Sequence, residues 1–297
     1  RDPLWSRGLG DVYKRQVRSL RTEPKPCPPQ ATPLLEVRKA SASYGHQPVL
    51  HDVSLKLYRG QTLAVIGESG SGKSSTARLI TGLLPPTSGQ VLYDGKALPA
   101  DYRQRSKEQL RRLQMIYQIP DTALNPRQRI VDIIGRPLSF YLGLKGQALR
   151  QRVAELLEMI ELDPALYMDR QPRELSGGQK QRICIARALA AEPQLIICDE
   201  VTSALDQLVA EGVLKLLNRI QQQLGVAYLF ITHDVATVRA IADEVLVMQR
   251  GKVVDHGCRE EIFTPPYRDY TGLLFSSEPE MDPDWLDHLL EKRALVS

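Results

Sequence analysis

The chain has 297 residues, of which 25% are charged and 42% hydrophobic, with 39 basic and 35 acidic side chains. This length allows one large domain or two modest ones with a buried core, and the composition is typical of a globular protein. The small net charge of +4 excludes a nucleic-acid binder that depends on a dominant basic surface. No apolar run approaches the roughly 18–20 residues that a membrane span needs, so we expect no transmembrane helix.

Four cysteines lie far apart and form no C-x-x-C pair. Cys184 and Cys198 sit inside apolar runs, where a thiol behaves as a small hydrophobic side chain. The sequence therefore predicts neither a disulfide framework nor a metal site built on cysteine, and it favours a reducing compartment.

Both ends of the chain differ from its body. Residues 1–16 show no helical or strand periodicity, and we interpret them as a non-native remnant or an ordinary disordered end. Residues 17–33 hold five prolines, which favour an extended linker. In the tail, residues 276–297, the apolar side chains of residues 285–290 recur at helical spacing and predict a short amphipathic helix.

Between these ends, strand and helix signals alternate along the chain. We expect strands at residues 53–57, 62–66, 90–93, 195–198, 226–231 and 244–248. Helical signals cover residues 73–84, much of 120–191, 207–223 and a stretch that begins at Asp234. This alternation predicts an α/β domain over residues 34–275, with a mainly parallel sheet and an inserted helical subdomain at about residues 119–191.

A glycine-rich loop separates the buried strand at residues 62–66 from the first helix. Its sequence, GESGSGKS at residues 67–74, fits the pattern G-x-x-x-x-G-K-[ST] in the strand–loop–helix context that the pattern requires. The backbone amides of such a loop form a nest for phosphate oxygens, and the following helix adds its positive end. We expect Lys73 to neutralise the β- and γ-phosphates and Ser74 to ligate Mg²⁺. The residues expected to bind the nucleotide are Gly67, Glu68, Ser69, Gly70, Ser71, Gly72, Lys73, Ser74 and Ser75.

An apolar strand that ends in two acids supplies a second element of an ATP site. Asp199 ends the strand LIICD, where its carboxylate can hold Mg²⁺ directly or through water. Glu200 is placed to polarise an attacking water molecule. Apolar strands that end in Asp are common in α/β proteins, so this strand indicates an ATP site only in combination with the phosphate loop.

The segment LSGGQ at residues 175–179 opens a helix far along the chain. Ser176 and the amides of Gly177 and Gly178 would form a second anion-binding helix end. One nucleotide cannot occupy both helix ends when a whole helical subdomain separates them. The second end would therefore meet the phosphate of a partner's nucleotide.

With these motifs in this order, residues 34–275 resemble the ATP-binding-cassette (ABC) ATPases, in which two cassettes sandwich two ATP molecules. The resemblance implies a P-loop NTPase (RecA-like) α/β core, an antiparallel β subdomain and an inserted α-helical signature subdomain. It also implies a catalytic set of Lys73, Gln118, Glu200 and His233, and a Mg²⁺ set of Ser74, Gln118 and Asp199. For nucleotide binding it adds Tyr44, which stacks on adenine, Asp206 of the D-loop SALD, and the signature residues Ser176, Gly177, Gly178 and Gln179.

Two departures from the family pattern leave the catalytic side chains intact. Val201 stands where proline usually follows the catalytic glutamate, which would loosen that turn. The sequence GQKQR is a mild variant of the usual extension of the signature. We therefore expect a competent hydrolytic half-site.

Three stretches resemble the oligopeptide, dipeptide and nickel importer group: the phosphate loop, DTALNPR at residues 121–127, and residues 262–271. The resemblance implies an ATPase that powers transmembrane permease subunits at the cytoplasmic face of the inner membrane, with a solute-binding protein as an indirect partner. The region after Gln118 would contact the permease. No cysteine follows Cys258, so no iron–sulfur cluster is expected, and the ending resembles the C-terminal cassette of fused two-cassette ATPases.

Two other functions stay open at the level of sequence. An accessory cassette of a phosphonate-cleaving (carbon–phosphorus lyase) complex would carry closely similar motifs. A cassette that binds nucleic acid is the weaker alternative, because the chain has no strong basic excess. We interpret the basic residues of the segment 103–112 as a solvated helix face rather than as a lipid or partner contact.

Overall fold

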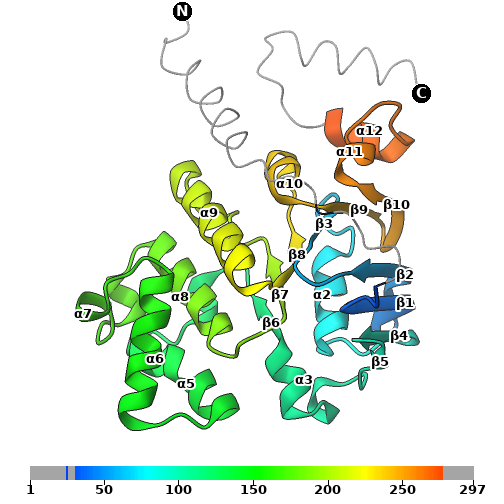
Figure 1. The fold of residues 1–297 in the computed structure, drawn as a ribbon. Coiled ribbons are helices and arrows are strands. Elements are labelled where there is room, and N and C mark those ends of the chain that lie inside the picture. Colours follow the sequence, from blue (N-terminus) through cyan, green and yellow to red (C-terminus); the bar gives the residue numbers. More distant parts are fainter. Residues whose placement is uncertain (1–24, 26–30, 277–297) are drawn as a thin grey trace, which may run out of the picture.

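The computed structural model describes residue 25 and residues 31–276, which form two sheets and a group of helices (Figure 1). The segment at residues 1–16, most of the linker at 17–33 and the amphipathic helix expected at 285–290 lie outside the described residues. Among the described residues, no helix is long and apolar enough to cross a bilayer.

A six-stranded sheet forms the centre of the molecule, in the order β10-β9-β3-β8-β7-β6. Its parallel strands are β6 (Leu113–Ile116), β7 (Leu195–Asp199), β8 (Ala227–Ile231), β3 (Thr62–Ile66) and β9 (Glu244–Gln249). The edge strand β10 (Lys252–Cys258) runs antiparallel to β9. The inner strands β3 and β8 are buried along their whole length, as expected for a parallel sheet covered on both faces. The predicted, mainly parallel sheet is confirmed.

A second sheet of four antiparallel strands has the order β2-β1-β4-β5. Its strands are β1 (Leu35–Tyr44), β2 (Gln47–Leu57), β4 (Ser88–Tyr93) and β5 (Lys96–Ala97). The sequence analysis found the end of β2 and part of β4 but missed β1. The reason is that β1 changes register after Val37, beside Lys39 with its positive φ of 45°, and this irregularity breaks the alternation of apolar residues.

Helix α2 (Lys73–Thr81) follows the phosphate loop and packs between the two sheets through Ala77, Leu79 and Ile80. The helix was predicted to reach residue 84. It ends earlier because Gly82 adopts a left-handed conformation with φ 79° and its amide bonds back to the Leu79 carbonyl.

A group of helices lies between β6 and β7 in the sequence, on the left of Figure 1. It consists of α4 (Pro120–Ala123), α5 (Ile130–Leu142), α6 (Gly146–Met159), α7 (Pro164–Tyr167) and α8 (Gly177–Leu189). An apolar stripe of α6 faces this group, because Val153, Leu156 and Leu157 are buried against α5 and α8. The structure thus has the three parts expected for the fold class: a P-loop core, an antiparallel sheet and a helical insertion.

The remaining helices follow β7 in the chain. They are α9 (Gln207–Leu224), α10 (Val235–Ile241), α11 (Arg259–Ile262) and α12 (Asp269–Ser276), while a shorter helix, α3 (Lys107–Arg112), precedes β6. Asp206 and Asp234 cap α9 and α10 by accepting bonds from backbone amides. The C-terminal helices α11 and α12 pack near β3 and β9 in a small apolar cluster of their own.

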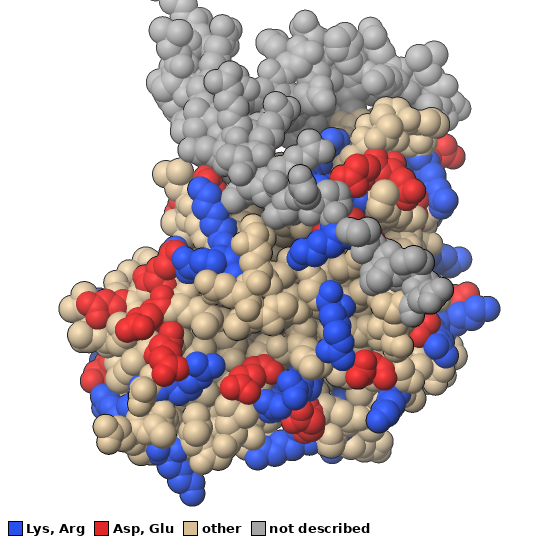
Figure 2. Space-filling model, in the orientation of Figure 1, with Lys and Arg blue, Asp and Glu red and all other residues tan. Residues whose placement is uncertain are grey.

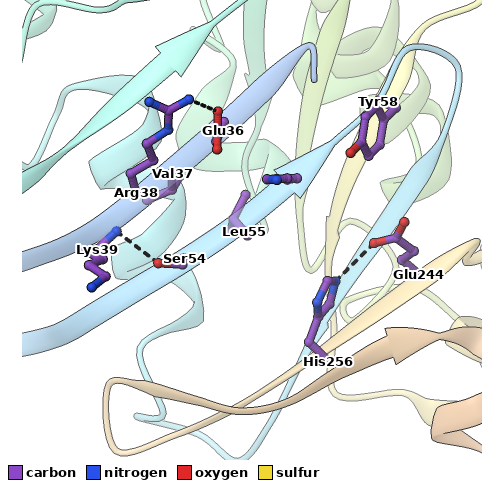
Figure 3. Close-up of a pocket in the computed structure, with 10 residues that line it drawn as sticks. Glu36, Val37, Arg38, Lys39, Ser54, Leu55, Tyr58, Glu244 and His256 are labelled. Carbon is purple, nitrogen blue, oxygen red and sulfur yellow. Dashed lines mark hydrogen bonds and ion pairs between the residues drawn. The ribbon is translucent and has the colours of Figure 1, made fainter. Parts of the chain in front are cut away.

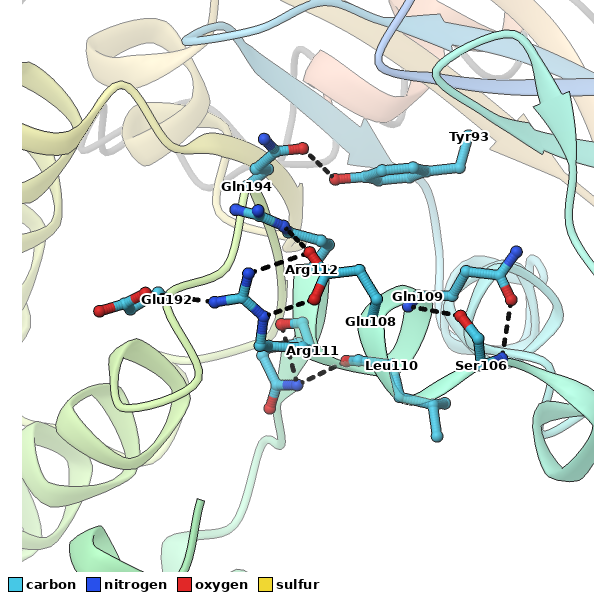
Figure 4. Close-up of polar contacts among 10 residues, drawn as sticks. Tyr93, Ser106, Glu108, Gln109, Leu110, Arg111, Arg112, Glu192 and Gln194 are labelled. Carbon is cyan, nitrogen blue, oxygen red and sulfur yellow. Dashed lines mark hydrogen bonds and ion pairs between the residues drawn. The ribbon is translucent and has the colours of Figure 1, made fainter. Parts of the chain in front are cut away.

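The basic segment at residues 103–112 is a solvated face only in part. Glu108 accepts bonds from both Arg111 and Arg112, and Arg111 also contacts Glu192 beyond α8 (Figure 4). Arg105, by contrast, is only 7% exposed. Its guanidinium donates from Nη1 to the Ile80 carbonyl at 2.8 Å and from Nε to the Pro99 carbonyl at 3.1 Å. The interpretation as a plain solvated face was therefore wrong for Arg105, which stabilises the carboxyl end of α2.

Burial lowers the pKa of Arg105 to about 10, so the side chain remains protonated at neutral pH.

Elsewhere, basic and acidic side chains are interspersed on the face shown in Figure 2 and form no continuous basic surface there. This distribution agrees with the small net charge.

We expect Arg105→Ala to lower the free energy of unfolding by about 2–4 kcal/mol, because two carbonyl groups lose a buried charged donor. Arg103→Ala is the matched control, since Arg103 is 75% exposed and its ion pair with Asp101 is long, at 3.7 Å. That control should change the free energy by less than about 0.5 kcal/mol. Urea denaturation measures both values, and equal stability of the two variants would contradict the structural role of Arg105.

Candidate nucleotide-binding site

The phosphate loop connects the end of β3 to the start of α2, and its shape depends on glycine. Gly67, Gly70 and Gly72 have φ values of 148°, 78° and 106°. A Cβ atom on Gly67 would lie 2.2 Å from the Met248 carbonyl oxygen of β9, and one on Gly72 would lie 2.9 Å from a Leu50 methyl carbon. The positive φ angles and the lack of room for a Cβ atom together require glycine at positions 67 and 72.

Lys73 lies across this loop, and its side chain is almost fully buried. Its ammonium donates to the carbonyl oxygens of Gly67, at 2.7 Å, and Glu68, at 2.8 Å. Burial lowers the pKa of Lys73, and the carboxylates of Glu200 and Asp199 oppose this shift. A cation held only by neutral carbonyls can transfer its bonds to a phosphate oxygen, which is the stronger partner.

The Ser71 hydroxyl is a second polar group in this loop. It is buried and has no hydrogen-bond partner among the described residues. Buried polar atoms are nearly always paired in folded proteins, so an orphaned hydroxyl in a loop of this shape indicates a ligand oxygen.

Ser74 and Asp199 meet beside the loop, where the Ser74 hydroxyl donates to the Asp199 carboxylate at 3.1 Å. Burial raises the pKa of Asp199, and the bond from Ser74 opposes that rise. In the part of the chain that the structure describes, no three His, Cys, Asp or Glu residues cluster as a metal site. One carboxylate and one hydroxyl do fit Mg²⁺, which uses one or two carboxylates together with phosphate oxygens.

Glu200 lies at the centre of a polar cluster at the same edge of the sheet. Its carboxylate accepts a bond from the Gln118 amide at 2.7 Å and lies 3.5 Å from Nδ1 of His233. These three residues follow β6, β7 and β8, which are neighbours in the parallel sheet. Since the carboxyl ends of adjacent parallel strands share one edge, the topology brings the predicted catalytic side chains together.

The backbone around Glu200 forms a closed turn. Glu200 has a positive φ of 49°. The Ser203 hydroxyl donates to the Glu200 carbonyl at 2.9 Å, and the Ser203 amide donates to the same oxygen at 3.1 Å. Val201 is buried in the core behind this turn, so the departure from proline leaves the turn closed and hydrogen-bonded.

The signature opens helix α8 as predicted. Ser176 caps this helix, and its hydroxyl accepts from the Gln179 amide in a reciprocal capping box. The Gln179 side chain also donates to the Tyr167 hydroxyl at 2.9 Å. Gly178 packs tightly against α9, since a Cβ there would lie 2.3 Å from a Val209 methyl carbon. Helix α8 packs on the face of the six-stranded sheet opposite to α2, so the structure does not bring the signature to the phosphate loop of its own chain (Figure 1).

Tyr44 and Asp206 complete the predicted set. Tyr44 ends β1 with its ring 42% exposed, and its hydroxyl accepts a bond at 2.9 Å from Arg78 of α2. Asp206 accepts from the Val209 amide at 3.0 Å as the cap of α9. Sequence reasoning missed the contacts of Arg78 and Ser203. The Ser203 contact had a local signal, a serine three residues after the glutamate, whereas nothing in the sequence indicates the Arg78 contact.

A pocket of about 610 Å³ lies elsewhere, between strands β1 and β2 of one sheet and strands β9 and β10 of the other. Its walls carry the Glu36–Arg38 ion pair and the contact between His256 and Glu244 (Figure 3). None of the predicted site residues lines it. This pocket is therefore separate from the predicted nucleotide site.

Comparison with known proteins agrees with the geometry. Residues 50–203 match the sequence family described as ABC transporter. The chain belongs to the ABC transporter family. The chain has the ATP-binding domain of that family, and members of the family hydrolyse ATP to power transport.

Several relatives of this ABC protein are ATP-binding proteins of transport systems. It is 46% identical to the oligopeptide transport ATP-binding protein OppF of Salmonella typhimurium. The 233 aligned residues cover 78% of this chain and 70% of OppF. It is 42% identical to the dipeptide transport ATP-binding protein DppF of Escherichia coli, over 79% and 70% of the two chains. It is also 43% identical to the nickel import ATP-binding protein NikE of Shigella boydii, over 72% and 80%.

Solved structures of ABC proteins have the same fold. The chain superimposes with a TM-score of 0.70 on cbiO1 of Clostridium perfringens, part of the ABC transporter complex cbiONQ, at 27% identity over 88% of this chain and 100% of the other. A dimeric ATP-binding cassette in a post-hydrolysis state with ADP and phosphate gives a TM-score of 0.67 at 28% identity, over 76% and 98%.

The packing of the loop leads to a stability prediction. We expect Gly67→Ala to lower the free energy of unfolding by about 2–4 kcal/mol, because the added Cβ would collide with a backbone carbonyl of β9. Gly70→Ala is the control, since a Cβ at Gly70 meets nothing within 4 Å and only its backbone is strained, which costs about 1–2 kcal/mol. Thermal and denaturant unfolding compare the two, and a larger loss in Gly70→Ala would contradict the close packing at Gly67.

Proposed function

We propose that this chain is the ATP-binding and ATP-hydrolysing subunit of an importer for peptides or related small solutes. The observation that carries the proposal is the cluster of Gln118, Glu200 and His233 beside the Ser74–Asp199 pair, at the sheet edge where the phosphate loop opens. The names of the relatives supply the substrate class, since OppF and DppF are named for oligopeptide and dipeptide transport.

In this proposal the phosphate loop binds the triphosphate of ATP. The amides of the loop and the amino end of α2 surround the phosphates, and the Ser71 hydroxyl bonds to one of their oxygens. Lys73 exchanges its two carbonyl partners for the β- and γ-phosphates. Tyr44 offers its exposed ring to the adenine, and Arg78 fixes the tyrosine hydroxyl. The contact set is Tyr44, Gly67, Glu68, Ser69, Gly70, Ser71, Gly72, Lys73, Ser74 and Ser75.

Mg²⁺ is the metal that these residues suit. Ser74 and Asp199 would hold it, with Gln118 as a further oxygen ligand, and the ion would neutralise charge on the β- and γ-phosphates. The raised pKa of Asp199 shows how strongly its burial disfavours an unpaired carboxylate, so a cation at this position stabilises the charged form.

Hydrolysis then depends mainly on positioning. Glu200 orients the attacking water and accepts its proton, while the amide of Gln118 holds one carboxylate oxygen in place. His233 approaches the other oxygen, and its exposed ring is free to contact the γ-phosphate. Lys73 stabilises the charge that develops on the transferred phosphoryl group.

A second cassette completes the site in this proposal. Because α8 and α2 lie on opposite faces of the sheet, the signature residues would serve the nucleotide of the partner. Ser176, Gly177, Gly178, Gln179 and the D-loop residue Asp206 form that contribution. The similar cassette that was solved as a dimer supports this arrangement.

The proposed membrane partners are permease subunits, which would hold the chain at the cytoplasmic face of the membrane. Exposed apolar side chains of Ile119, next to Gln118, and Phe140, on α5, offer a contact surface in this region. A solute-binding protein would act indirectly, through the permease, and no nucleic acid takes part. The transport names of the relatives disfavour the phosphonate-cleaving alternative.

Glu200→Gln tests the hydrolytic role. We expect turnover to fall about 10²–10⁴-fold, because glutamine cannot accept the proton of the water, while ATP affinity stays within about threefold. The matched control is Glu158→Gln on the exposed face of α6, which should leave both quantities unchanged. Phosphate release measures turnover and equilibrium dialysis measures ATP binding. Near-normal hydrolysis in Glu200→Gln would contradict the assignment.

Purification of the tagged chain from its native membrane tests the transport role. We expect integral-membrane permease subunits to co-purify in mild detergent, and their retention to decrease in Ile119→Asp, because a charge on that surface disrupts an apolar contact. Soluble lyase subunits in place of permeases would instead favour the phosphonate-cleaving complex and overturn the import proposal.

A further inference from the structure

The C-terminal segment reaches back to the phosphate loop. The Glu68 amide of the loop donates a hydrogen bond to the hydroxyl oxygen of Tyr270, on α12, at 3.3 Å. The two residues are 202 positions apart in the chain, and Tyr270 lies in the stretch 262–271 that the ATP-site motifs do not include. A side chain outside the motifs thus touches the backbone of the predicted ATP site.

The contact acts on the peptide group that joins Gly67 to Glu68. Its N–H is bonded to Tyr270, and its carbonyl oxygen accepts a 2.7 Å bond from the ammonium of Lys73. This peptide group is therefore held from both sides, by a phenol oxygen and by the lysine that ATP would recruit.

Several contacts hold Tyr270 in position. The neighbouring Thr271 hydroxyl donates to the buried Asp255 carboxylate of β10 at 2.7 Å, and Arg268 pairs with the same carboxylate at 3.2 Å. The ring of Tyr270 packs on an apolar cluster that includes Ala64 and Ile66 of β3, the strand that leads into the loop. The hydroxyl is therefore fixed relative to the base of the phosphate loop.

A stack of side chains also contacts the same segment. The rings of Phe263 and Phe275 stack with centroids 4.8 Å apart, and the guanidinium of Arg239 on α10 lies 4.2 Å from the centroid of the Phe263 ring. Because α10 follows β8, this contact ties the C-terminal helices to the half of the sheet that carries His233.

We propose that Tyr270 is a positioning residue of the ATP site, which holds the peptide group between Gly67 and Glu68 and thereby sets the shape of the phosphate loop before ATP arrives. The inference rests on the proposed function as an ATP-binding subunit. A loop that is already in its binding shape loses less conformational entropy when the ligand binds. The C-terminal segment would therefore contribute to ATP affinity without touching ATP.

Tyr270→Phe tests the proposal because it removes one oxygen and keeps the ring in the apolar cluster. We expect the KM and the Kd for ATP to rise about 3–10-fold, while kcat stays within about twofold, since no group that acts on the γ-phosphate changes. Tyr267→Phe is the matched control. Its hydroxyl donates to the Phe263 carbonyl at 3.4 Å within the same segment, so this variant should keep the wild-type KM and Kd.

A second variant tests the route by which Tyr270 is held. Thr271→Val removes the hydroxyl that bonds to Asp255, and it should raise the Kd for ATP by about 2–5-fold through the displacement of Tyr270. The Kd for ATP of the double variant, Tyr270→Phe with Thr271→Val, should be at most about twice the Kd of Tyr270→Phe alone, because both changes act on the same bond. A rise in Kd of the double variant equal to the product of the two single rises would contradict a coupling between Thr271 and Tyr270.

Direct titration with a fluorescent ATP analogue separates this inference from the proposed function. A wild-type chain that binds ATP, together with an unchanged Kd in Tyr270→Phe, would overturn the inference alone. An equal rise in Kd for Tyr267→Phe would also overturn it, because the effect would then be a general loosening of the segment. A wild-type chain that binds no ATP would overturn the proposed function, and the inference with it.

Discussion

The parallel pairing of β3, β8, β7 and β6 is the constraint on which the rest of the structure depends. Parallel neighbours end at the same edge, so the residues that follow each strand converge there however far apart they lie in the sequence. In this chain the residues that converge are the phosphate loop, His233, Glu200 and Gln118. Gly67 is required at the start of the loop because β3 and β9 lie side by side, which leaves no room for a Cβ atom beside the Met248 carbonyl.

The same sheet separates the phosphate loop from the signature segment of one chain. Its two faces carry separate apolar cores, one shared with α2 and the antiparallel strands, the other with α8 and the helical group. A helix end on one face cannot reach a ligand on the other. In the proposed function, the phosphate loop and the signature of one chain therefore serve different nucleotides. The ion pair of Arg111 with Glu192 links α3 to the end of the helical group (Figure 4).

The sequence predicted the parts that depend on local patterns and missed those that depend on packing. The phosphate loop, the helix that opens at the signature and the buried strands follow from neighbouring residues, and they were located to within one or two positions. Strand β1 was missed because its bulge breaks the alternation. The burial of Arg105 and the contact of Tyr270 with the loop arise between segments distant in the chain, which no periodicity records.

The left-handed backbone at Glu200 has a consequence for substitutions at this turn. A glutamate at φ 49° is strained, by about 1–2 kcal/mol, in a conformation that glycine or asparagine adopts at lower cost. In the proposed function, this turn is a place where a substitution that relieves the strain would remove the catalytic carboxylate.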